Sequence, residues 1–400
     1  MMAVITKRST RLSDGRELIY FDDADTRLPS HRAEDSRAPA ERPATASMRQ
    51  DPLTGEWISI AAARQNRVFL PAADADPLAP ASPTNPSEIP SHYDVAVFEN
   101  KSPSFGPLAT DDNAPRDLSD LARVGLERTR TAVGRCEVVC FSPETTGSFA
   151  GLSPSRARTV IEAWADRTEH LSALPGVHQV FPFENRGEAI GVTLHHPHGQ
   201  IYAYPYITPR TQAVLRSLDA YGASLFADIL ARERASSRVV LSGEHWSAFV
   251  PFAARWPLEI HLMPHRHIPD LAATTLAERD ELALLYLRLL RGVDAIYDTP
   301  TPYIAAWHQA PLGPRRKDVR LMLQITSPRR AADKLKFLAG SESAMGAWIG
   351  DIPPEQAAET VRAGIARADR ENPVGELNVT VTGRVKGRVN DMNERKNNDD

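Results

Sequence analysis

The order of the predicted elements is the sequence feature that most constrains the fold of this chain. Strand-like runs, one long amphipathic helix and further strand-like runs follow one another, and this order occurs twice along the 400 residues. Such a pattern is typical of an antiparallel sheet covered by helices, and not of a regular βαβ alternation. We therefore predict an α+β fold made of two similar halves, each with an antiparallel sheet flanked by helices.

Local signals mark the starts of the two long helices. Ser153 and Pro154 provide an N-cap and a first-turn proline for the first helix. Residues 275–278, Thr-Leu-Ala-Glu, form a capping box ahead of the second. No G-x-G-x-x-G or G-x-x-x-x-G-K-[ST] motif occurs, so the chain lacks the glycines that Rossmann and P-loop folds need for binding phosphate groups. Strands are predicted at 57–60, 93–98, 137–141, 177–183, 201–207, 246–252, 259–263 and 320–326, and a last helix at 353–366.

Composition divides the chain into four parts. Residues 1–46 mix charges, alanine, proline and serine without an apolar period, which predicts a disordered N-terminal extension. The first half of the fold is expected at 47–212 and the second at 213–385. Residues 386–400 are polar and charged, so a flexible tail is expected there.

Charge and hydropathy exclude several classes of partner. A net charge of −4 gives no global field that would attract nucleic acid or an anionic membrane, so any anionic ligand must be bound locally. The most apolar stretch, 282–290, is interrupted by Arg288 and falls short of the about 20 residues that a membrane helix needs. The first residues lack the pattern of a secretory signal, and we expect a cytoplasmic protein. Cys136 and Cys140 lie in one predicted strand and are expected to be buried thiols without a disulfide.

The densest cluster of reactive side chains lies in the middle of the chain. His196 and His198 stand two apart, so in a strand both imidazoles would project from the same face. Pro197 suits the end or edge of a strand, and Gly199 leaves room for the close approach of a backbone or ligand. Gln200 adds a neutral amide on the face of His198. An isolated His-x-His is more often a core or surface pair, so the interpretation depends on the Pro, Gly and Gln around it.

This face suits either nucleophilic chemistry or a metal ion. An imidazole with an ordinary pKa of about 6.5 is largely neutral at pH 7, so His198 can attack phosphorus without a separate base. Two histidines at i and i+2 also provide half of a zinc site, but Leu194, Gly199 and Ile201 nearby add no ligand. Gln200 favours phosphoryl transfer, because a neutral donor stabilises charged oxygens without raising the pKa of the imidazole.

The histidine-rich segment resembles the active-site signature of the galactose-1-phosphate uridylyltransferase family, within the histidine-triad superfamily; it reads ENRGEAIGVTLHHPHGQIYAYP. The similarity continues in one order through DPLTGEWISIAAARQNR, FENKSPSF, CFSPE, EHWSAFVPFAARWPLEIHLMPHRH, YIAAWHQAP and KLKFLAGSESAMGAW, about three quarters of the chain. The resemblance implies two histidine-triad-like halves with half-barrel-like antiparallel sheets. It also implies a homodimer with the active site at the subunit interface.

The resemblance further implies a ping-pong transfer of UMP from UDP-glucose to galactose 1-phosphate, which gives glucose 1-phosphate and UDP-galactose. His198 would be the nucleophile, His196 would orient it or line the site, and Gln200 would hold the transferred phosphoryl group. The substrate-binding residues implied are Asn100, Asn185, Gly191 and Thr193 for the nucleotide, Arg64 and Arg67 for the diphosphate, supplied in the family across the subunit interface, and Lys336, Phe337 and Glu342 for the hexose phosphate.

Most of these residues also have a purely structural interpretation. Arg64 and Arg67, three apart, are compatible with a solvated helix face. Asn100 and Asn185 each follow Phe-Glu and suit turns that their side chains stabilise. Lys336 and Glu342 are compatible with ordinary surface charges, and the sequence leaves the role of His308 open.

Two metal sites of the family are degraded in this chain. The family's zinc site uses a Cys-x-x-Cys pair, a later histidine and the first histidine of the His-Pro-His motif, and only His196 remains of these ligands. Asp76 and Ala79 stand at the cysteine pair, and Thr145 at the later histidine. The positions of the family's iron ligands hold Val214, Met322 and Gln324, with only His308 kept. We predict no bound zinc or iron, with a weak divalent-cation site at Asp76 and His196 as the alternative.

The sequence therefore predicts a uridylyltransferase with no metal cofactor. One alternative is another nucleotidyltransferase or phosphorylase of the superfamily, acting on ADP-sugars or dinucleoside polyphosphates. A second is a nucleotide-sugar-binding protein without turnover. Labelling by UDP-glucose and not by ADP-glucose would separate the first alternative, and a His198→Asn variant the second.

Overall fold

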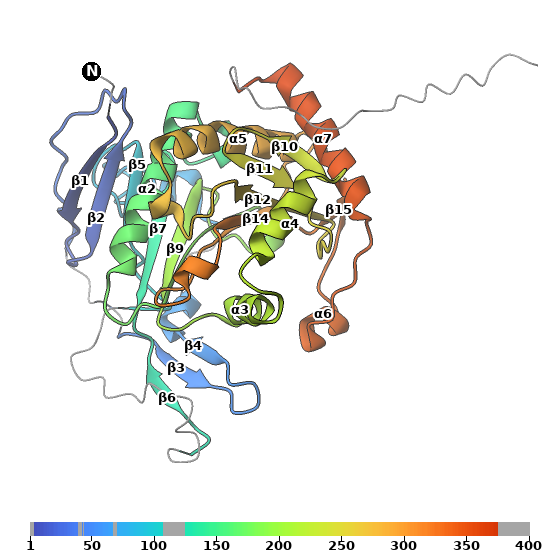
Figure 1. Cartoon of the computed structure of the whole chain (residues 1–400). Coiled ribbons are helices and arrows are strands. Elements are labelled where there is room, and N and C mark those ends of the chain that lie inside the picture. The colour runs from blue at the N-terminus through green and yellow to red at the C-terminus, as the bar shows by residue number, and fades with distance from the viewer. Residues whose placement is uncertain (1–3, 39–41, 43, 67–69, 107–124, 375–400) are drawn as a thin grey trace, which may run out of the picture.

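The computed structural model describes residues 4–38, 42, 44–66, 70–106 and 125–374. The predicted tail at 386–400 lies outside these residues. Within them, eleven strands form one antiparallel sheet in the order β1-β2-β5-β7-β9-β8-β13-β14-β12-β11-β10 (Figure 1). The strands are β1 (Thr6–Arg11), β2 (Glu17–Asp22), β5 (Val95–Glu99), β7 (Arg135–Cys140), β8 (Gln179–Arg186), β9 (His198–Tyr204), β10 (Val239–Ser242), β11 (Trp246–Phe249), β12 (Leu258–Pro264), β13 (Tyr303–His308) and β14 (Met322–Ser327).

Two halves meet side by side within this sheet. The first half contributes the strands from β1 to β8, and the second half those from β13 to β10. Strands β8 and β13 join them in antiparallel register, with Ala306 opposite Phe183 and Tyr303 opposite Arg186. The prediction of an α+β fold with antiparallel sheet and flanking helices is confirmed, and the two sheets are continuous.

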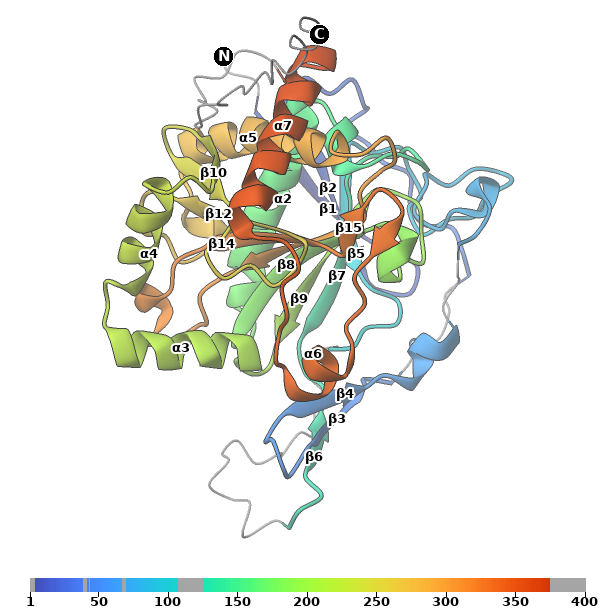
Figure 2. The same ribbon diagram turned by 90° about the vertical axis from the view of Figure 1, so that its right-hand side faces the viewer.

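Three long helices cover one face of the sheet: α2 (Pro154–Ser172), α5 (Leu276–Asp294) and α7 (Pro354–Glu371) (Figure 2). Both predicted N-caps are present. The Ser153 hydroxyl accepts from the backbone N–H of Arg156 at 3.1 Å, and Thr275 and Glu278 form the reciprocal capping box. Apolar side chains of these helices and of the strands form one large core that runs through both halves. The opposite face is left to the smaller elements and the site.

The smaller elements surround this framework. The predicted boundary between 212 and 213 falls inside helix α3 (Pro209–Tyr221). No helix in the described ranges is long and apolar enough to span a bilayer. The smaller elements are a three-stranded sheet of β3 (Ser47–Gln50), β4 (Trp57–Ile60) and β6 (Thr129–Thr131), the helices α3 (Pro209–Tyr221), α4 (Leu225–Arg234) and α6 (Gly340–Met345), and the strand pair β15 (Arg329–Ala331) and β16 (Lys334–Leu335).

The N-terminal segment corrects one prediction. Residues 1–46 were expected to be disordered, but β1 and β2 form a hairpin at the edge of the main sheet. Strand β2 pairs with β5, and its residues Leu18, Ile19, Tyr20 and Phe21 are each at most 1% exposed. This four-residue apolar run buries enough surface to order the segment, despite the charges around it.

Candidate active site

His198 opens strand β9 on the face of the sheet opposite the long helices. Ile201 and Ala203 of the same strand pack into the core with α2, so alternation turns His198 and Gln200 to the other face. His196 precedes the strand and is only 3% exposed, whereas His198 is partly exposed. The two imidazoles thus differ in exposure, because His196 is enclosed by its partners while His198 stays partly open.

The tautomer of His198 follows from one hydrogen bond. Its Nδ1 lies 2.7 Å from the backbone oxygen of His196. A carbonyl oxygen only accepts, so Nδ1 carries the proton and donates it. The lone pair is then on Nε2, and burial lowers the pKa of the His198 imidazole, which favours the neutral form. His198 thus meets the requirements of a neutral nitrogen nucleophile.

Both ring nitrogens of His196 are engaged in the interior. Nδ1 lies 2.6 Å from the Asp76 carboxylate, and Nε2 lies 2.8 Å from the Ser142 backbone oxygen and 3.0 Å from the Tyr93 hydroxyl. The next residue is also tied down, because its carbonyl accepts from the backbone N–H of Phe141 at 3.0 Å. This network holds the backbone that fixes His198.

Gln200 is linked to Arg64 through Tyr202. The Tyr202 hydroxyl lies 3.4 Å from the Gln200 Oε1, and Arg64 donates to the Tyr202 oxygen at 3.3 Å and to the Ser104 hydroxyl at 2.9 Å. A hydroxyl that donates to Oε1 leaves the amide N–H groups of Gln200 for a ligand. Arg64 belongs to the 3-10 helix η1 (Ala62–Asn66) and reaches the site of its own chain. Arg67 lies outside the described residues.

Gly199 has a packing role on the core side of β9. A Cβ built there would lie 2.8 Å from Cζ of Phe141 and 3.0 Å from the backbone oxygen of Phe183. The close approach predicted for this glycine is therefore made by the core and by the neighbouring strand. A side chain at this position would displace the strand that carries His198 and Gln200.

The predicted nucleotide residues lie on three segments near β9. Asn185 lies on β8 on the same face as Phe183, which pairs with Gln200. Gly191 ends a short 3-10 helix with φ 81°, and the carbonyl of Thr193 accepts from Leu70 N–H at 2.8 Å.

Asn100 has the turn role that was the structural alternative. Its Oδ1 accepts from the backbone N–H of Ser102 at 2.9 Å, at the end of β5. This bond uses only the side-chain oxygen of Asn100. The amide N–H groups of Asn100 take no part in it and can donate to a ligand. A turn role and a ligand contact are thus compatible.

The predicted hexose-phosphate residues lie on an arm of the second half, around α6 (Figure 1). Lys336 is 6% exposed and its ammonium donates to the backbone oxygens of Arg255, at 3.3 Å, and Ile349. It also lies 3.3 Å from the Glu342 carboxylate, whereas the Phe337 ring is 76% exposed. The structure brings Lys336 and Glu342 together and leaves Phe337 facing solvent.

Comparisons with known proteins identify the family. The family model described as galactose-1-phosphate uridyl transferase, N-terminal domain, matches residues 36–208, and the model of the C-terminal domain matches 207–372. A galactose-1-phosphate uridylyltransferase of Streptomyces lividans is 46% identical over 89% of this chain and 97% of the relative. The chain belongs to the galactose-1-phosphate uridylyltransferase family. One of Thermotoga maritima is 32% identical over 79% of this chain and 97% of the relative.

Solved structures agree with this family. A uridylyltransferase structure matches with a TM-score of 0.70 and 30% identity over 80% of this chain and 99% of that chain. An ADP-glucose phosphorylase from Arabidopsis thaliana matches with a TM-score of 0.56 at 21% identity, which indicates a shared fold only.

The residues at the position of the family's zinc site do not fit a zinc ion. Asp76 and His196 are in direct contact, so their ligand atoms bind each other. The other atoms at His196 are the Ser142 backbone oxygen and the Tyr93 hydroxyl, and burial raises the pKa of that hydroxyl well above its ordinary value. The described part of the chain contains no group of three or more His, Cys, Asp or Glu placed to hold a metal ion.

His308 lies in a second polar chain of the C-terminal half. Its Nε2 donates to the Gln324 Oε1 at 3.0 Å, and the Gln324 amide donates to Glu259 at 2.6 Å. His261 also lies 3.0 Å from Glu259. Burial, with the nearby charge of Arg210, lowers the pKa of His308 to about 3. His308 and Gln324, two of the positions of the family's iron site, thus form a hydrogen bond with each other.

Several residues of the site escape sequence reasoning. Tyr93 and Ser142 contact His196 but lie 103 and 54 residues away along the chain. Phe181, Phe183 and Tyr202 form an aromatic floor beside Gln200, with ring centroids 5.2 and 5.1 Å apart. The period-two pattern of VFPF and IYAY is a signal that could have revealed this floor.

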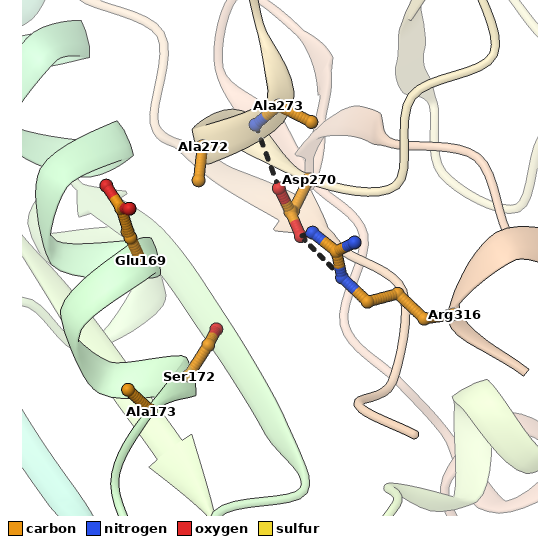
Figure 3. Close-up of a pocket in the computed structure, with 7 residues that line it drawn as sticks. All are labelled: Glu169, Ser172, Ala173, Asp270, Ala272, Ala273 and Arg316. Atoms are coloured by element: carbon orange, nitrogen blue, oxygen red, sulfur yellow. Dashed lines mark hydrogen bonds and ion pairs between the residues drawn. The ribbon is translucent and has the colours of Figure 1, made fainter. Parts of the chain in front are cut away.

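A separate hollow lies at the end of α2 (Figure 3). Glu169, Ser172, Asp270 and Arg316 are among its lining residues, and none of the predicted site residues is. Asp270 caps the backbone N–H of Ala273 at 3.0 Å and pairs with Arg316 at 3.1 Å. Asp270 and Arg316 are thus committed to structural contacts.

Proposed function

We propose that this chain exchanges UMP between UDP-glucose and galactose 1-phosphate by a ping-pong mechanism, with His198 as the covalent carrier. The observation that carries the proposal is the hydrogen bond from His198 Nδ1 to the backbone of His196. It leaves an unprotonated Nε2 on a partly exposed face, with Gln200 two residues further along the same face.

In the first half-reaction, the Nε2 lone pair attacks the α-phosphorus of UDP-glucose. The phosphorus–oxygen bond to the glucose phosphate breaks, and glucose 1-phosphate leaves with the bonding electrons. The imidazole becomes positively charged, and its Nδ1–H remains bonded to the His196 carbonyl. In the second half-reaction, a phosphate oxygen of galactose 1-phosphate attacks the same phosphorus, and the nitrogen–phosphorus bond breaks. The leaving group is the glucose 1-phosphate anion in the first step and the neutral His198 imidazole in the second, so neither step needs a strong general acid.

The other residues bind and orient the substrate. Gln200 holds the transferred phosphoryl group through its amide N–H groups. These hydrogen bonds stabilise the transition state, in which negative charge develops on the phosphoryl oxygens. Arg64 meets the diphosphate with its planar fork of donors. Asn100, Asn185, Gly191 and Thr193 bind the nucleotide, and Lys336, Phe337 and Glu342 the hexose phosphate. His196 is a positioning residue, because it acts through the backbone and not on the substrate.

The proposed assembly is a homodimer whose active site lies at the subunit interface. The α6 arm supports it, because Phe337, Met345 and Ile349 are 76%, 81% and 57% exposed. Large apolar side chains gathered on one segment mark an interaction surface. Sedimentation equilibrium should give twice the chain mass of 44.0 kDa, and a double Phe337→Ser, Met345→Ser variant should shift toward the monomer. A wild-type mass of one chain would reject this assembly.

A His198→Asn variant tests the proposed function. It should lose the exchange of labelled glucose 1-phosphate into UDP-glucose while still binding UDP. His195→Asn is the matched control, because the His195 side chain is 55% exposed and lies 3.5 Å from Glu188. Retained exchange in His198→Asn would remove His198 from the mechanism.

The wild-type protein separates the remaining alternatives. Exchange with ADP-glucose in place of UDP-glucose would indicate a phosphorylase or adenylyltransferase. Binding of UDP-glucose without any exchange would indicate a non-catalytic nucleotide-sugar-binding protein.

A further inference from the structure

The hairpin of β1 and β2, residues 6–22, lies outside the part of the chain that the family model matches. That match begins at residue 36, whereas the hairpin pairs along β5 and is part of the main sheet. Strand β5 ends at Glu99, directly before Asn100. The hairpin therefore lies against the strand that leads into a proposed nucleotide-binding residue.

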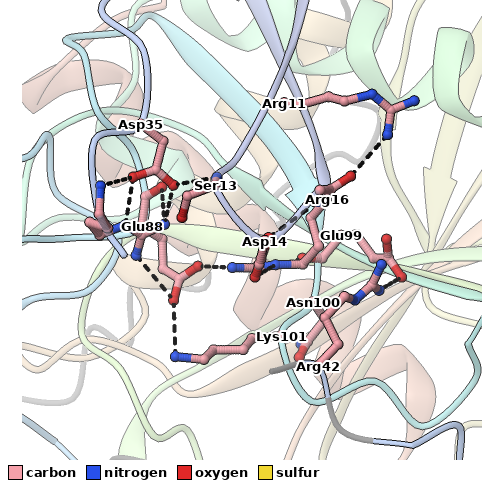
Figure 4. A network of polar contacts seen from close by, with 12 residues as sticks. Arg11, Ser13, Asp14, Arg16, Asp35, Arg42, Glu88, Glu99, Asn100 and Lys101 are labelled. Carbon is pink, nitrogen blue, oxygen red and sulfur yellow. Dashed lines mark hydrogen bonds and ion pairs between the residues drawn. The ribbon is translucent and has the colours of Figure 1, made fainter. Parts of the chain in front are cut away.

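Arg16, at the tight end of the hairpin, makes the connection (Figure 4). It is 2% exposed, and its guanidinium donates to the Asp14 carboxylate at 2.6 Å, to the backbone oxygen of Glu99 at 2.9 Å and to the Glu88 carboxylate. A buried guanidinium is costly unless its donors are paired. One side chain thus ties the hairpin to two separate segments.

The first segment is the peptide group between Glu99 and Asn100. Its carbonyl accepts from Arg16, and its N–H donates to the backbone oxygen of Cys136 on β7 at 2.8 Å. The Glu99 side chain is held as well, by Arg42 and by Arg135 at 3.4 Å. With both ends of the peptide bonded, the plane that sets the direction of Asn100 is fixed.

The second segment is the loop that carries Asp76. Glu88, the partner of Arg16, closes this loop through its own N–H, which donates to the backbone oxygen of Pro77 at 3.0 Å. Asp76 at the start of the loop pairs with His196, which fixes His198. Arg16 contacts this loop at Glu88, at the other end of the loop from Asp76, whereas its contact with the Glu99–Asn100 peptide is direct.

We infer that the N-terminal hairpin is a positioning element for nucleotide binding, and that Arg16 is the positioning residue through which it acts on Asn100. The inference rests on the proposed role of Asn100 in binding the uridine nucleotide. It assigns the hairpin an effect on the affinity for the uridine nucleotide, and not on the chemistry at phosphorus.

Steady-state kinetics of Arg16 variants test this assignment in the full-length chain. Arg16→Met should raise KM for UDP-glucose about fivefold, since it removes a charge-assisted hydrogen bond. The values of kcat and of KM for galactose 1-phosphate should stay within about twofold, because the inference places the effect of Arg16 on nucleotide binding. A purely structural loss would instead lower the active fraction, and with it kcat, without changing KM. Arg8→Met is the matched control, because Arg8 pairs with Asp22 at 2.9 Å in the same hairpin. The KM of this variant for UDP-glucose should be unchanged.

Arg16→Lys keeps the test decisive if Arg16→Met does not fold. The ammonium retains the charge against Asp14 and Glu88 but lacks the planar fork that also reaches the Glu99 carbonyl. It should raise KM for UDP-glucose and weaken UDP binding in calorimetry by the same factor. Wild-type affinity for UDP in a folded Arg16→Lys protein would overturn the inference. Absence of UDP-glucose exchange in the wild type would instead reject the proposed function.

Discussion

At the scale of single residues, the buried pairing of Asp76 with His196 supports the segment that carries His198, the proposed nucleophile. The carboxylate is 2.6 Å from His196 Nδ1, and the residue is 5% exposed. The pair fixes His196, and the His196 carbonyl fixes the tautomer of His198. An interaction between two side chains therefore determines which nitrogen of a third is free to react.

Removing this carboxylate should impair both stability and turnover. Asp76→Ala leaves a buried imidazole nitrogen without its partner, and we expect the free energy of unfolding to fall by about 3 kcal/mol. The exchange rate should fall too, because the His198 backbone is released, and Asp76→Asn should have a smaller effect. Urea unfolding and exchange assays measure both. The control is Asp74→Ala, at an exposed residue of the same loop, and equal behaviour of the two alanine variants would contradict this account.

Glu184 should make the stability of the protein depend on pH. It is 3% exposed, accepts from the Tyr303 hydroxyl at 3.1 Å, and has no described partner at Oε2. Burial raises the pKa of this carboxyl group to about 8. The folded state therefore binds more protons than the unfolded state between the two pKa values, so Glu184 lowers the free energy of unfolding as pH rises from about 5 to 8.

A Glu184→Gln variant tests this dependence. It should be more stable than the wild type at pH 8, by an amount on the order of a few kcal/mol, and the difference should shrink toward pH 5. Urea unfolding across this range gives the difference directly. Glu188→Gln changes an exposed carboxylate nearby and should follow the wild type. Parallel curves for wild type and Glu184→Gln would show that the carboxylate is not protonated in the folded state.

Residue-level prediction succeeds where function depends on local spacing. The two-residue step from His198 to Gln200 in a strand places both on one face, and the structure agrees. The same argument does not reveal that His196 is buried, because β9 begins only after it and its partner Asp76 lies 120 residues away in the sequence. Contacts of that separation are fixed by the fold and not by a local pattern.

At the scale of elements, strand β9 joins the reactive face to the core. His198 and Gln200 face outward, while Gly199 lies against Phe141 and the Phe183 backbone. The absence of a side chain at Gly199 thus sets the depth at which His198, the proposed nucleophile, lies.

Gly199→Ala should therefore destabilise the protein. Its Cβ would lie 2.8 Å from Phe141 Cζ and 3.0 Å from a backbone oxygen, and overpacking of this kind costs about 1–3 kcal/mol. Thermal unfolding should show a lower midpoint, with reduced exchange activity. At Gly151 an added Cβ meets no atom within 4 Å, so Gly151→Ala is the control. An unchanged midpoint for Gly199→Ala would contradict the packing role.

A helix can be predicted from the sequence where an N-cap residue precedes a long amphipathic stretch. Both long helices begin where their N-cap residues predict. The β1–β2 hairpin was missed because its surrounding composition is that of a linker, yet Leu18 to Phe21 form a short apolar run typical of a buried strand. Strand β13 was missed because AWHQAP was assigned to a motif and not to an element.

At the scale of the whole molecule, two halves share one sheet and one large core, and side chains bond to each other at both positions that the family resemblance assigns to metals. Asp76 pairs with His196, and His308 pairs with Gln324. Stability should then come from packing and hydrogen bonding without a metal.

Chelation should leave the protein intact. Dialysis against EDTA should change neither the midpoint of thermal unfolding nor the rate of UDP-glucose exchange, since metal-dependent folds lose stability when the ion is removed. Elemental analysis of the purified protein accompanies the assay. One zinc bound tightly to each chain, together with a lower midpoint after chelation, would contradict the hydrogen-bonded arrangement.

The central claim is that His198 carries the uridylyl group, and trapping this intermediate tests it most directly. The wild-type protein is incubated with radiolabelled UDP-glucose alone, digested, and analysed by mass spectrometry. We predict one uridylyl group on the peptide that contains His198, labile to acid and stable to base, with one glucose 1-phosphate released for each group bound. A label on another residue, or release of glucose 1-phosphate without any covalent adduct, would contradict the account.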